Sequence, residues 1–411
     1  MDRNRHFDQG LLFVILALMG FGLIMVYSAS SITSLTEMLD GQYYFKRQLL
    51  FVFLGLISMF VFSNIHYRKL ENIAVPLLLT SICFLILVLF AQKIGGAHRW
   101  LRIGGLGFQP SELAKIAFLI YMAHSISTRQ DRITELVRGI LPDLGVMLVV
   151  FLLILKEPNL STAAIIASTY FMMLFLGNGS IAHLAWMGVS GATMVVALIF
   201  QEGYRMRRLL AFLDPWGASK TAGYHIIQSL VAIGSGGLWG LGLGQSRQKF
   251  FILPERHTDF IYAIVCEELG LIGGLFVLVL FFILIWRGFY IAMRAPDLFG
   301  FLLASGITCL VATQGLINLG VVLSLFPTTG VTLPFISTDC SKTEIGCPAY
   351  NSGFHAIGLA EIQAVDAIAM GILLNISRFG SNSHAMLDNR RRPFSQRLSA
   401  ISDRSASRRR A

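Results

Sequence analysis

The feature that most constrains this chain is a succession of ten apolar runs. They lie at residues 10–30, 47–64, 73–92, 110–127, 139–156, 160–177, 183–201, 260–285, 299–323 and 366–379, the last being the shortest. A helix needs about 20 apolar residues to cross the hydrocarbon core of a membrane. The pattern therefore predicts an all-α, polytopic integral membrane protein with about ten transmembrane helices.

Composition excludes the main soluble classes. The chain is 55% hydrophobic and 14% charged, whereas soluble proteins carry about 25% charged residues. This excludes a soluble enzyme, a disordered protein and a disulfide-stapled secreted domain. The net charge is +10, but much of it lies in the C-terminal tail. Overall basicity therefore does not indicate a nucleic-acid partner.

The distribution of Lys and Arg predicts the orientation. An even number of spans places both termini on one side, and the basic residues of the short loops and tail gather mainly on that side. Because short cytoplasmic loops carry the excess of Lys and Arg, we expect both termini to be cytoplasmic. Residues 1–380 then form the transmembrane domain, and 381–411 form a basic cytoplasmic tail that is too poor in large apolar residues to fold by itself.

One long loop, about 202–259, lies on the opposite, extracytoplasmic side. It contains the basic residues Arg205, Arg207, Arg208, Lys220, Arg247, Lys249 and Arg256. The orientation rule applies only weakly to long loops, so these cations do not contradict the topology. Cations gathered on one face favour an anionic ligand. The alternative is that they are ordinary solvated loop charges.

A glycine-rich run, Gly234 to Ser246, lies inside this loop. Glycine allows backbone N–H groups to approach a phosphate closely. No Gly-Lys-Ser/Thr sequence follows, so the run is not a Walker loop. Arg247 and Lys249 come directly after it, which favours an anion site. A tight turn or a re-entrant segment would use glycine in the same way.

Asp259 stands where the long loop meets the eighth apolar run. A partly desolvated carboxylate there can gain the pKa of a useful general base. Arg256 and the positive end of the following helix would instead lower this pKa, because both favour the ionised carboxylate. The alternative role is structural, with Thr258 or Asp259 capping the helix. The residues alone leave base and cap equally open.

Charged residues also lie within the apolar runs. Glu112 and Lys115 are three residues apart, on one face of the expected fourth helix. Such charges are costly in a membrane and are usually paired or functional, so a structural ion pair and a ligand role both remain open. Glu267 and Glu268 lie two turns into the eighth run. At least one must face the bundle interior, where pairing with Lys115 is one option.

These residues carry a family resemblance. The matching stretches are Gln109 to Lys115, Gly234 to Gly244, Leu253 to Phe260, Glu267 to Gly270 and Pro327 to Ser337. Together they resemble the SEDS family (shape, elongation, division and sporulation), which includes FtsW, RodA and SpoVE. The segment from Gly244 to Phe251, and the Pro-Glu-Arg-His-Thr-Asp sequence after it, are more similar to the FtsW and SpoVE branch than to RodA.

The resemblance implies a peptidoglycan glycosyltransferase that polymerises lipid II during cell division. It implies a class B penicillin-binding protein and other division proteins as partners, and a bacterial cytoplasmic membrane location at the septum. Asp259 falls on the family's essential acidic position and is the expected catalytic residue. The expected substrate-binding residues are Arg99, Arg102, Glu112, Lys115, Arg205, Arg208, Arg247, Lys249, Arg256 and His257. No cofactor is predicted outright; Mg²⁺ or Mn²⁺ on the diphosphate stays open, without a dedicated protein ligand cluster.

The chain departs from the family pattern at residues 338–366. After Ser337 the family continues into Tyr-Gly-Gly-Ser-Ser and an apolar helix, whereas Thr338-Asp339-Cys340 follows here, and the pattern resumes near Ala367. This leaves two rival functions open. One is a lipid II flippase or other transporter, which needs a polar path through the membrane. The other is a non-catalytic division scaffold that recruits a penicillin-binding protein.

Overall fold

The computed structural model describes residues 7–38, 41–91, 98–103, 106–219, 223–249, 259–337 and 360–380. Most of them are helical, which confirms the predicted fold class. The α-helices are α1 (Gln9–Met38), α2 (Tyr43–Asn64), α3 (Arg68–Leu89), α4 (Pro110–Thr128), α5 (Leu141–Lys156), α6 (Leu160–Leu176), α7 (Ile181–Gln201), α8 (Gly203–Leu213), α9 (Gly223–Gly236), α10 (Ile261–Met293), α11 (Leu298–Val322) and α12 (Ala360–Gly380).

Each of the ten predicted runs coincides with one of these helices. Within the described chain, seven helical segments are long and apolar enough to cross a membrane, and α6 is a shorter apolar helix. The described helix α12 begins at Ala360, so it is longer than the run predicted at 366–379. Most side chains of α4 are buried inside the bundle.

Helix boundaries follow local sequence signals. Pro110 occupies the first turn of α4, where its missing N–H costs nothing. The side chain of Asn159 accepts a hydrogen bond from the N–H of Thr162 (3.3 Å) and caps α6. Asp297 accepts one from the N–H of Gly300 (2.7 Å) and caps α11. Such caps satisfy N–H groups that have no partner within the helix.

The predicted loops contain further elements. A short antiparallel hairpin, β1 (Leu101–Ile103) and β2 (Leu106–Phe108), precedes α4. A 3₁₀ turn, η1 (Gln130–Arg132), and a π-helical turn, η2 (Leu136–Ile140), precede α5. The long loop is not one irregular segment, because α8 and α9 form within it. Residues 338–359 of the atypical segment and the tail 381–411 lie outside the described residues.

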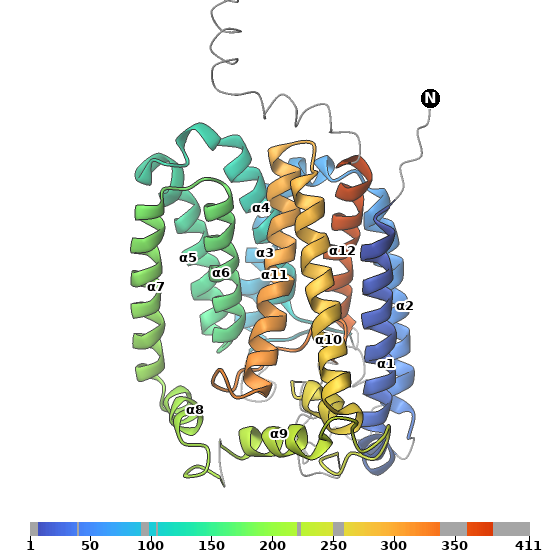
Figure 1. Ribbon diagram of the computed structural model, residues 1–411. Helices are drawn as coiled ribbons and strands as arrows, with labels where there is room; N and C mark the ends of the chain where they lie inside the picture. The colour runs from blue at the N-terminus through green and yellow to red at the C-terminus, as the bar shows by residue number, and fades with distance from the viewer. Residues whose placement is uncertain are drawn as a thin grey trace, which may run out of the picture.

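The long helices stand side by side and alternate in direction along the chain (Figure 1). One end of the bundle carries short connections between α2 and α3, α6 and α7, and α10 and α11; we call it the turn end. The start of α1 and the end of α12 also lie there, where the N–H of Asp8 donates to Ser377 Oγ (3.2 Å). The opposite end, with α8, α9 and the hairpin, is the loop end.

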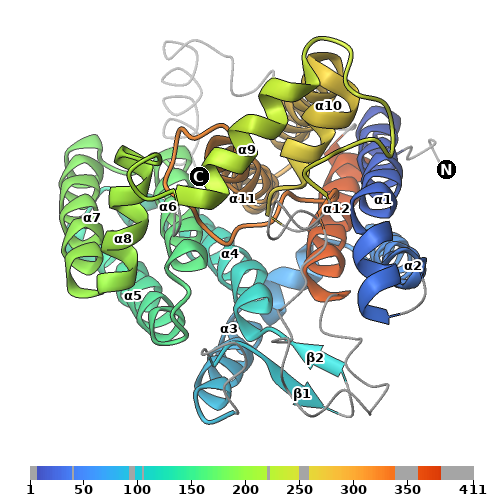
Figure 2. The same ribbon diagram turned by 90° about the horizontal axis from the view of Figure 1, so that it is seen from below.

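At the loop end, α9 lies across α10 and α11 (Figure 2). Ser229 of α9 donates to the carbonyl oxygen of Val322 in α11 (2.8 Å). Segment 323–337 then returns from α11 into the bundle, and Phe335 and Ile336 are buried. This return brings the segment close to the beginning of α10.

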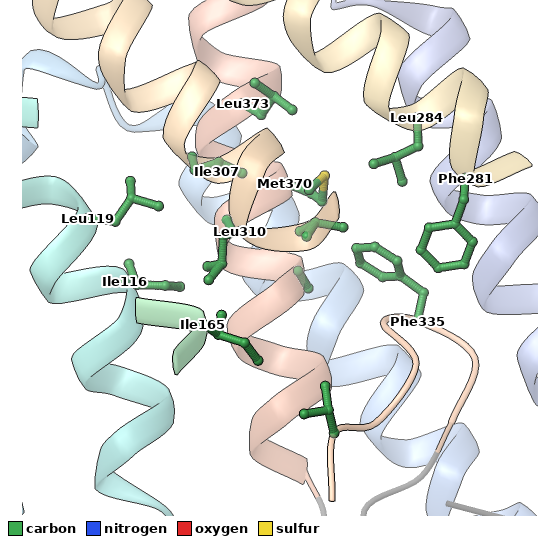
Figure 3. Close-up of a cluster of buried hydrophobic side chains, with 14 of the residues drawn as sticks. Ile116, Leu119, Ile165, Phe281, Leu284, Ile307, Leu310, Phe335, Met370 and Leu373 are labelled. Carbon is green, nitrogen blue, oxygen red and sulfur yellow. The ribbon is translucent and has the colours of Figure 1, made fainter. Parts of the chain in front are cut away.

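The core lies between α4, α6, α10, α11 and α12. Ile116, Ile165, Leu310, Phe335 and Met370, which come from four helices and the returning segment, belong to one buried cluster (Figure 3). In addition, Asn375 of α12 donates to the carbonyl of Ser63 (2.6 Å) and accepts from the N–H of Tyr67 (2.9 Å). The last helix is therefore fully incorporated into the bundle, despite the atypical sequence before it.

Candidate active site

Asp259 lies at the loop end, directly before α10 and only partly exposed. The N-cap of α10 is Phe260, whose side chain makes no capping hydrogen bond. Asp259 is one residue outside this N-cap position. Thr258, the other proposed cap, lies outside the described residues.

Asn318 holds the backbone around Asp259 in place. From α11, its amide nitrogen Nδ2 donates to the carbonyl oxygens of Asp259 (2.8 Å) and Val331 (2.7 Å). A Cβ placed on Gly330 would lie 3.9 Å from Asp259 Oδ2. The carboxylate therefore lies beside Gly330, which is adjacent to it in space although distant in sequence.

Arg208 of α8 reaches the chain segment around Gly330. Its Nη1 donates to the carbonyl oxygen of Thr328 (3.2 Å), and its guanidinium lies over the ring of Tyr204, 5.1 Å from the centroid. Next to Thr328, the hydroxyl of Thr329 is buried without a hydrogen-bond partner in the described structure. A carboxylate, a guanidinium and a hydroxyl thus gather around one short segment.

The glycine-rich run forms a tight turn against α10. At Gly270 the backbone leaves helical geometry, with φ 68° and ψ −164°. The N–H groups of Leu241 and Gly242 donate to the carbonyls of Glu267 and Glu268 (3.0 and 2.9 Å). In return, the N–H groups of Leu271 and Ile272 donate to the carbonyls of Gly237 and Leu238 (2.9 and 3.4 Å).

The turn thereby replaces hydrogen bonds that a continuous helix would form between residues 267 and 271 and between 268 and 272. Gly240 has φ +80°, and a Cβ on it would overlap the carbonyl of Glu268. The structure supports the tight-turn alternative for this run, because these backbone N–H groups already have protein partners.

The side chains of Glu267 and Glu268 bind residues 246–249, which directly follow this turn. Glu267 accepts from Ser246 Oγ and from the N–H of Arg247 (2.9 Å). Glu268 accepts from Ser28 Oγ of α1 (2.6 Å) and pairs with Lys249 Nζ (3.4 Å). Both carboxylates are buried. Neither is paired with Lys115 in the interactions described, so that option for the two glutamates is not supported.

Lys249 and Arg247 differ although they are neighbours in sequence. Lys249 is buried, with its ammonium between Glu268 and the carbonyl of Gly244. Arg247 is exposed. In this conformation Lys249 stabilises the glycine-rich turn, whereas the side chain of Arg247 is accessible to a ligand.

Arg99 anchors the segment before the hairpin. Its guanidinium donates to the backbone carbonyls of Glu157 (3.0 Å) and Pro158 (2.5 Å), in the turn between α5 and α6. The side chain of Glu157 is buried, and neither of its carboxylate oxygens has a hydrogen-bond partner among the described residues. Burial raises the pKa of Glu157 to about 8, although the charge of Arg99 acts in the opposite direction.

Four further predicted site residues add less. Arg205 donates to the carbonyl of Leu198 (3.0 Å) and so ties α8 to the end of α7. Arg102 lies in β1, where the structure describes its backbone but not its side chain. Arg256 and His257 also lie outside the described residues, and their predicted roles are untested.

Glu112 and Lys115 form an ion pair inside the bundle. Lys115 Nζ lies 2.7 Å from Glu112 Oε2, and the two side chains are 4% and 3% exposed. The predicted pairing on one helix face is therefore present. Both side chains are buried inside the bundle, so the pair is separated from the exposed cations of the loop end.

Sequence reasoning did not single out Asn318, Thr329 or His225. The ring of His225, in α9, stacks on Phe260 with centroids 6.0 Å apart, beside Asp259. Only Thr329 lay in a stretch already noted for its family resemblance; the other two are single polar residues within apolar helices. Among the described residues, no group of three or more His, Cys, Asp or Glu is placed to hold a metal ion.

Comparison with known proteins agrees with this arrangement. The family model for FtsW, RodA and SpoVE, described as "Cell cycle protein", matches residues 9–345. The chain belongs to the FtsW/RodA/SpoVE family. Stage V sporulation protein E of Bacillus subtilis is a family relative 41% identical over 377 residues, which cover 90% of this chain and 97% of the relative.

Other relatives place the chain within this family more narrowly. The probable peptidoglycan glycosyltransferase FtsW of Trichlorobacter lovleyi is 41% identical over 378 residues, which cover 91% of this chain and 94% of the relative. The predicted likeness to the FtsW and SpoVE branch is thus confirmed.

Solved structures share the FtsW/RodA/SpoVE fold. A chain from "Structural coordination of polymerization and crosslinking by a peptidoglycan synthase complex" has a TM-score of 0.72 and 26% identity, covering 92% of this chain and 99% of that one. RodA of Thermus thermophilus has a TM-score of 0.63 and 27% identity, covering 91% and 98%.

Proposed function

We propose that this protein is a peptidoglycan glycosyltransferase that polymerises lipid II at the loop end of the bundle. The observation that carries the proposal is the convergence of Asp259 and Arg208 on residues 328–331. A base for a sugar hydroxyl and a cation for a diphosphate are the two groups that this reaction requires. The name of the FtsW relatives supports the same activity.

In the proposed reaction, a sugar hydroxyl oxygen of one lipid II molecule attacks the anomeric carbon of the other. The bond from this carbon to the diphosphate oxygen breaks, and its electron pair leaves with the diphosphate. The hydroxyl proton passes to the carboxylate of Asp259, which acts as general base. In-line attack inverts the anomeric centre and produces a β-linked glycan.

The cations of the loop end stabilise the charge that develops on the departing diphosphate. A guanidinium has five N–H donors, so Arg208 can hold Thr328 with one and bind a phosphate oxygen with others. Exposed Arg247 is a second candidate ligand. Arg99, Arg102, Arg205, Arg256 and His257 complete the proposed set, while Lys249 contributes through the glycine-rich turn.

The loop end faces the outside of a bacterial cytoplasmic membrane in this proposal, and both termini face the cytoplasm. A class B penicillin-binding protein is the proposed partner at the division septum, together with other division proteins. The structural likeness to a chain of a peptidoglycan synthase complex supports a partner of this kind.

The test compares Asp259→Asn with Asp214→Asn. Asp214 is a suitable control because it lies in the same loop, where its Oδ1 accepts from the N–H of Gly217 (3.0 Å). The purified complex with its penicillin-binding partner is given lipid II, and glycan chains are separated on a gel. General-base catalysis contributes about 100- to 10,000-fold, so we expect a loss of that size for Asp259→Asn and near-normal polymerisation for Asp214→Asn.

Near-normal polymerisation by a folded Asp259→Asn variant would remove Asp259 from the mechanism. A parental complex that binds its partner yet makes no glycan would favour the scaffold, and lipid II translocation in vesicles without polymerisation would favour the flippase. A chain with the family-type sequence at 338–366 serves as reference for the effect of that segment.

A further inference from the structure

A third charged side chain lies in the bundle interior beside Glu112 and Lys115. Asp366 belongs to α12, is 2% exposed, and lies within electrostatic reach of Lys115 and Glu112. It is the last residue of the segment that departs from the family pattern, so resemblance gives no reason to expect a carboxylate there.

The register of the two helices explains this proximity. α4 and α12 run in the same direction, from the loop end to the turn end (Figure 1). Leu119 of α4 and Met370 of α12 belong to one buried cluster and lie at about the same height in Figure 3, whereas Ile116 lies lower. Lys115 lies four residues before Leu119, and Asp366 lies four residues before Met370. One helical turn toward the loop end therefore brings Asp366 to about the level of Lys115.

We propose that Asp366 is a positioning residue that joins Glu112 and Lys115 in one buried charge cluster and couples α12 to α4 through the Lys115 ammonium. One ammonium that interacts with two carboxylates carries no surplus positive charge. Such a lysine is poorly suited to bind a diphosphate, so the cluster assigns Lys115 to holding the two helices in register. Its effect on lipid II polymerisation rests on the proposed function above.

A double-mutant cycle tests the cluster. Lys115→Met keeps the apolar stem but leaves two buried carboxylates without a cation, and breaking a buried pair is strongly destabilising. We expect a fall in Tm of about 10 °C in detergent. Asp366→Asn alone leaves the neutral pair of Glu112 and Lys115 and should change Tm little. When Asp366→Asn is combined with Lys115→Met, the double variant should regain a large part of the Tm that Lys115→Met alone loses.

The matched control is Asp143→Asn, because Asp143 is also buried beside α4 but pairs with Arg129 (2.6 Å). Asp143→Asn combined with Lys115→Met should lower Tm by the sum of the two single effects. Strict additivity of Lys115→Met and Asp366→Asn would overturn the cluster. This thermal cycle needs no enzymatic activity, so it decides the cluster even if the proposed function fails.

The activity readout separates positioning from substrate binding. Measured per folded molecule, Lys115→Met should lower kcat about tenfold with little change in KM for lipid II, and Asp366→Asn should restore part of kcat. Lys115→Arg keeps the charge and should retain most of the activity. A raised KM that Asp366→Asn does not restore would make Lys115 a substrate ligand and reject its assignment as a positioning residue.

Discussion

The two ends of the bundle use charged residues in different ways. At the turn end, Asp297 caps α11 and also accepts from Tyr67 Oη (3.0 Å) and Arg68 Nε (2.8 Å). At the loop end, Arg99 and Arg208 donate to backbone carbonyls, while Glu157 and Thr329 have buried oxygens without partners among the described residues.

This difference indicates that the two ends of the bundle serve stability and function to different degrees. A carboxylate that accepts several hydrogen bonds from charged or hydroxyl donors stabilises a helix junction. The guanidinium of Arg208 is held by a neutral carbonyl, so its positive charge remains available to an anion. The charges described at the turn end therefore serve stability, whereas the loop end also presents Arg208 and exposed Arg247, which suit an anionic substrate.

The largest expected effect on stability concerns the backbone of the loop end. Gly240→Ala places a Cβ at φ +80° and against the Glu268 carbonyl. A left-handed conformation costs a non-glycine residue about 1–2 kcal/mol, and steric overpacking about 1–3 kcal/mol more. We expect a clear fall in Tm together with loss of polymerisation, because the turn that carries Arg247 and Lys249 is displaced.

Gly234→Ala is the control for that change. Gly234 lies in helical α9 with open space around it, so alanine should be neutral or slightly stabilising. Equal effects of the two substitutions would show that the glycine-rich turn does not depend on close packing against α10.

A smaller effect is expected from Glu157→Gln, and it depends on pH. Because burial raises the pKa of Glu157 in the folded protein to about 8 from the ordinary 4.5, the folded state binds this proton more tightly than the unfolded state does. The stabilising contribution is complete below pH 4.5 and is lost as the pH rises through 8. Glutamine has no such proton, so the variant should gain stability relative to the parent as pH rises.

Thermal melts at pH 5 and pH 8 measure this difference between the parent and Glu157→Gln. The parent should lose more stability across that interval than the variant, by a few kcal/mol at most. Parallel pH dependences would mean that Glu157 is ionised in the folded protein, and the loop end would then be closer to the turn end in its charge pairing.

The smallest effect is expected at the turn end from Asp297→Asn. Asparagine still caps α11, but it weakens the charge-assisted bonds to Tyr67 and Arg68, which are worth about 1–3 kcal/mol. Tm should fall modestly, and polymerisation per folded molecule should remain near normal. A selective loss of activity at unchanged Tm would contradict the division of roles between the two ends.

Local sequence was sufficient for much of this fold. Apolar runs predict the ten long helices, because a buried or lipid-facing helix must satisfy its own backbone groups. Pro110 marks the start of α4, and the spacing of Glu112 and Lys115 predicts their ion pair, because residues three apart share a helix face. The motif around Asp259 identified the family that the comparisons then confirmed.

Tertiary structure alone decided which distant groups meet. Nothing local to Asp259 indicates that Gly330 and Asn318 lie beside it, or that the glycine-rich turn completes the hydrogen bonds of α10 across Gly270. Likewise, Asp366 lies within electrostatic reach of Lys115 only because α4 and α12 pack against each other. Helix formation depends on neighbours in sequence, whereas these contacts depend on how whole helices pack, which no short stretch of sequence specifies.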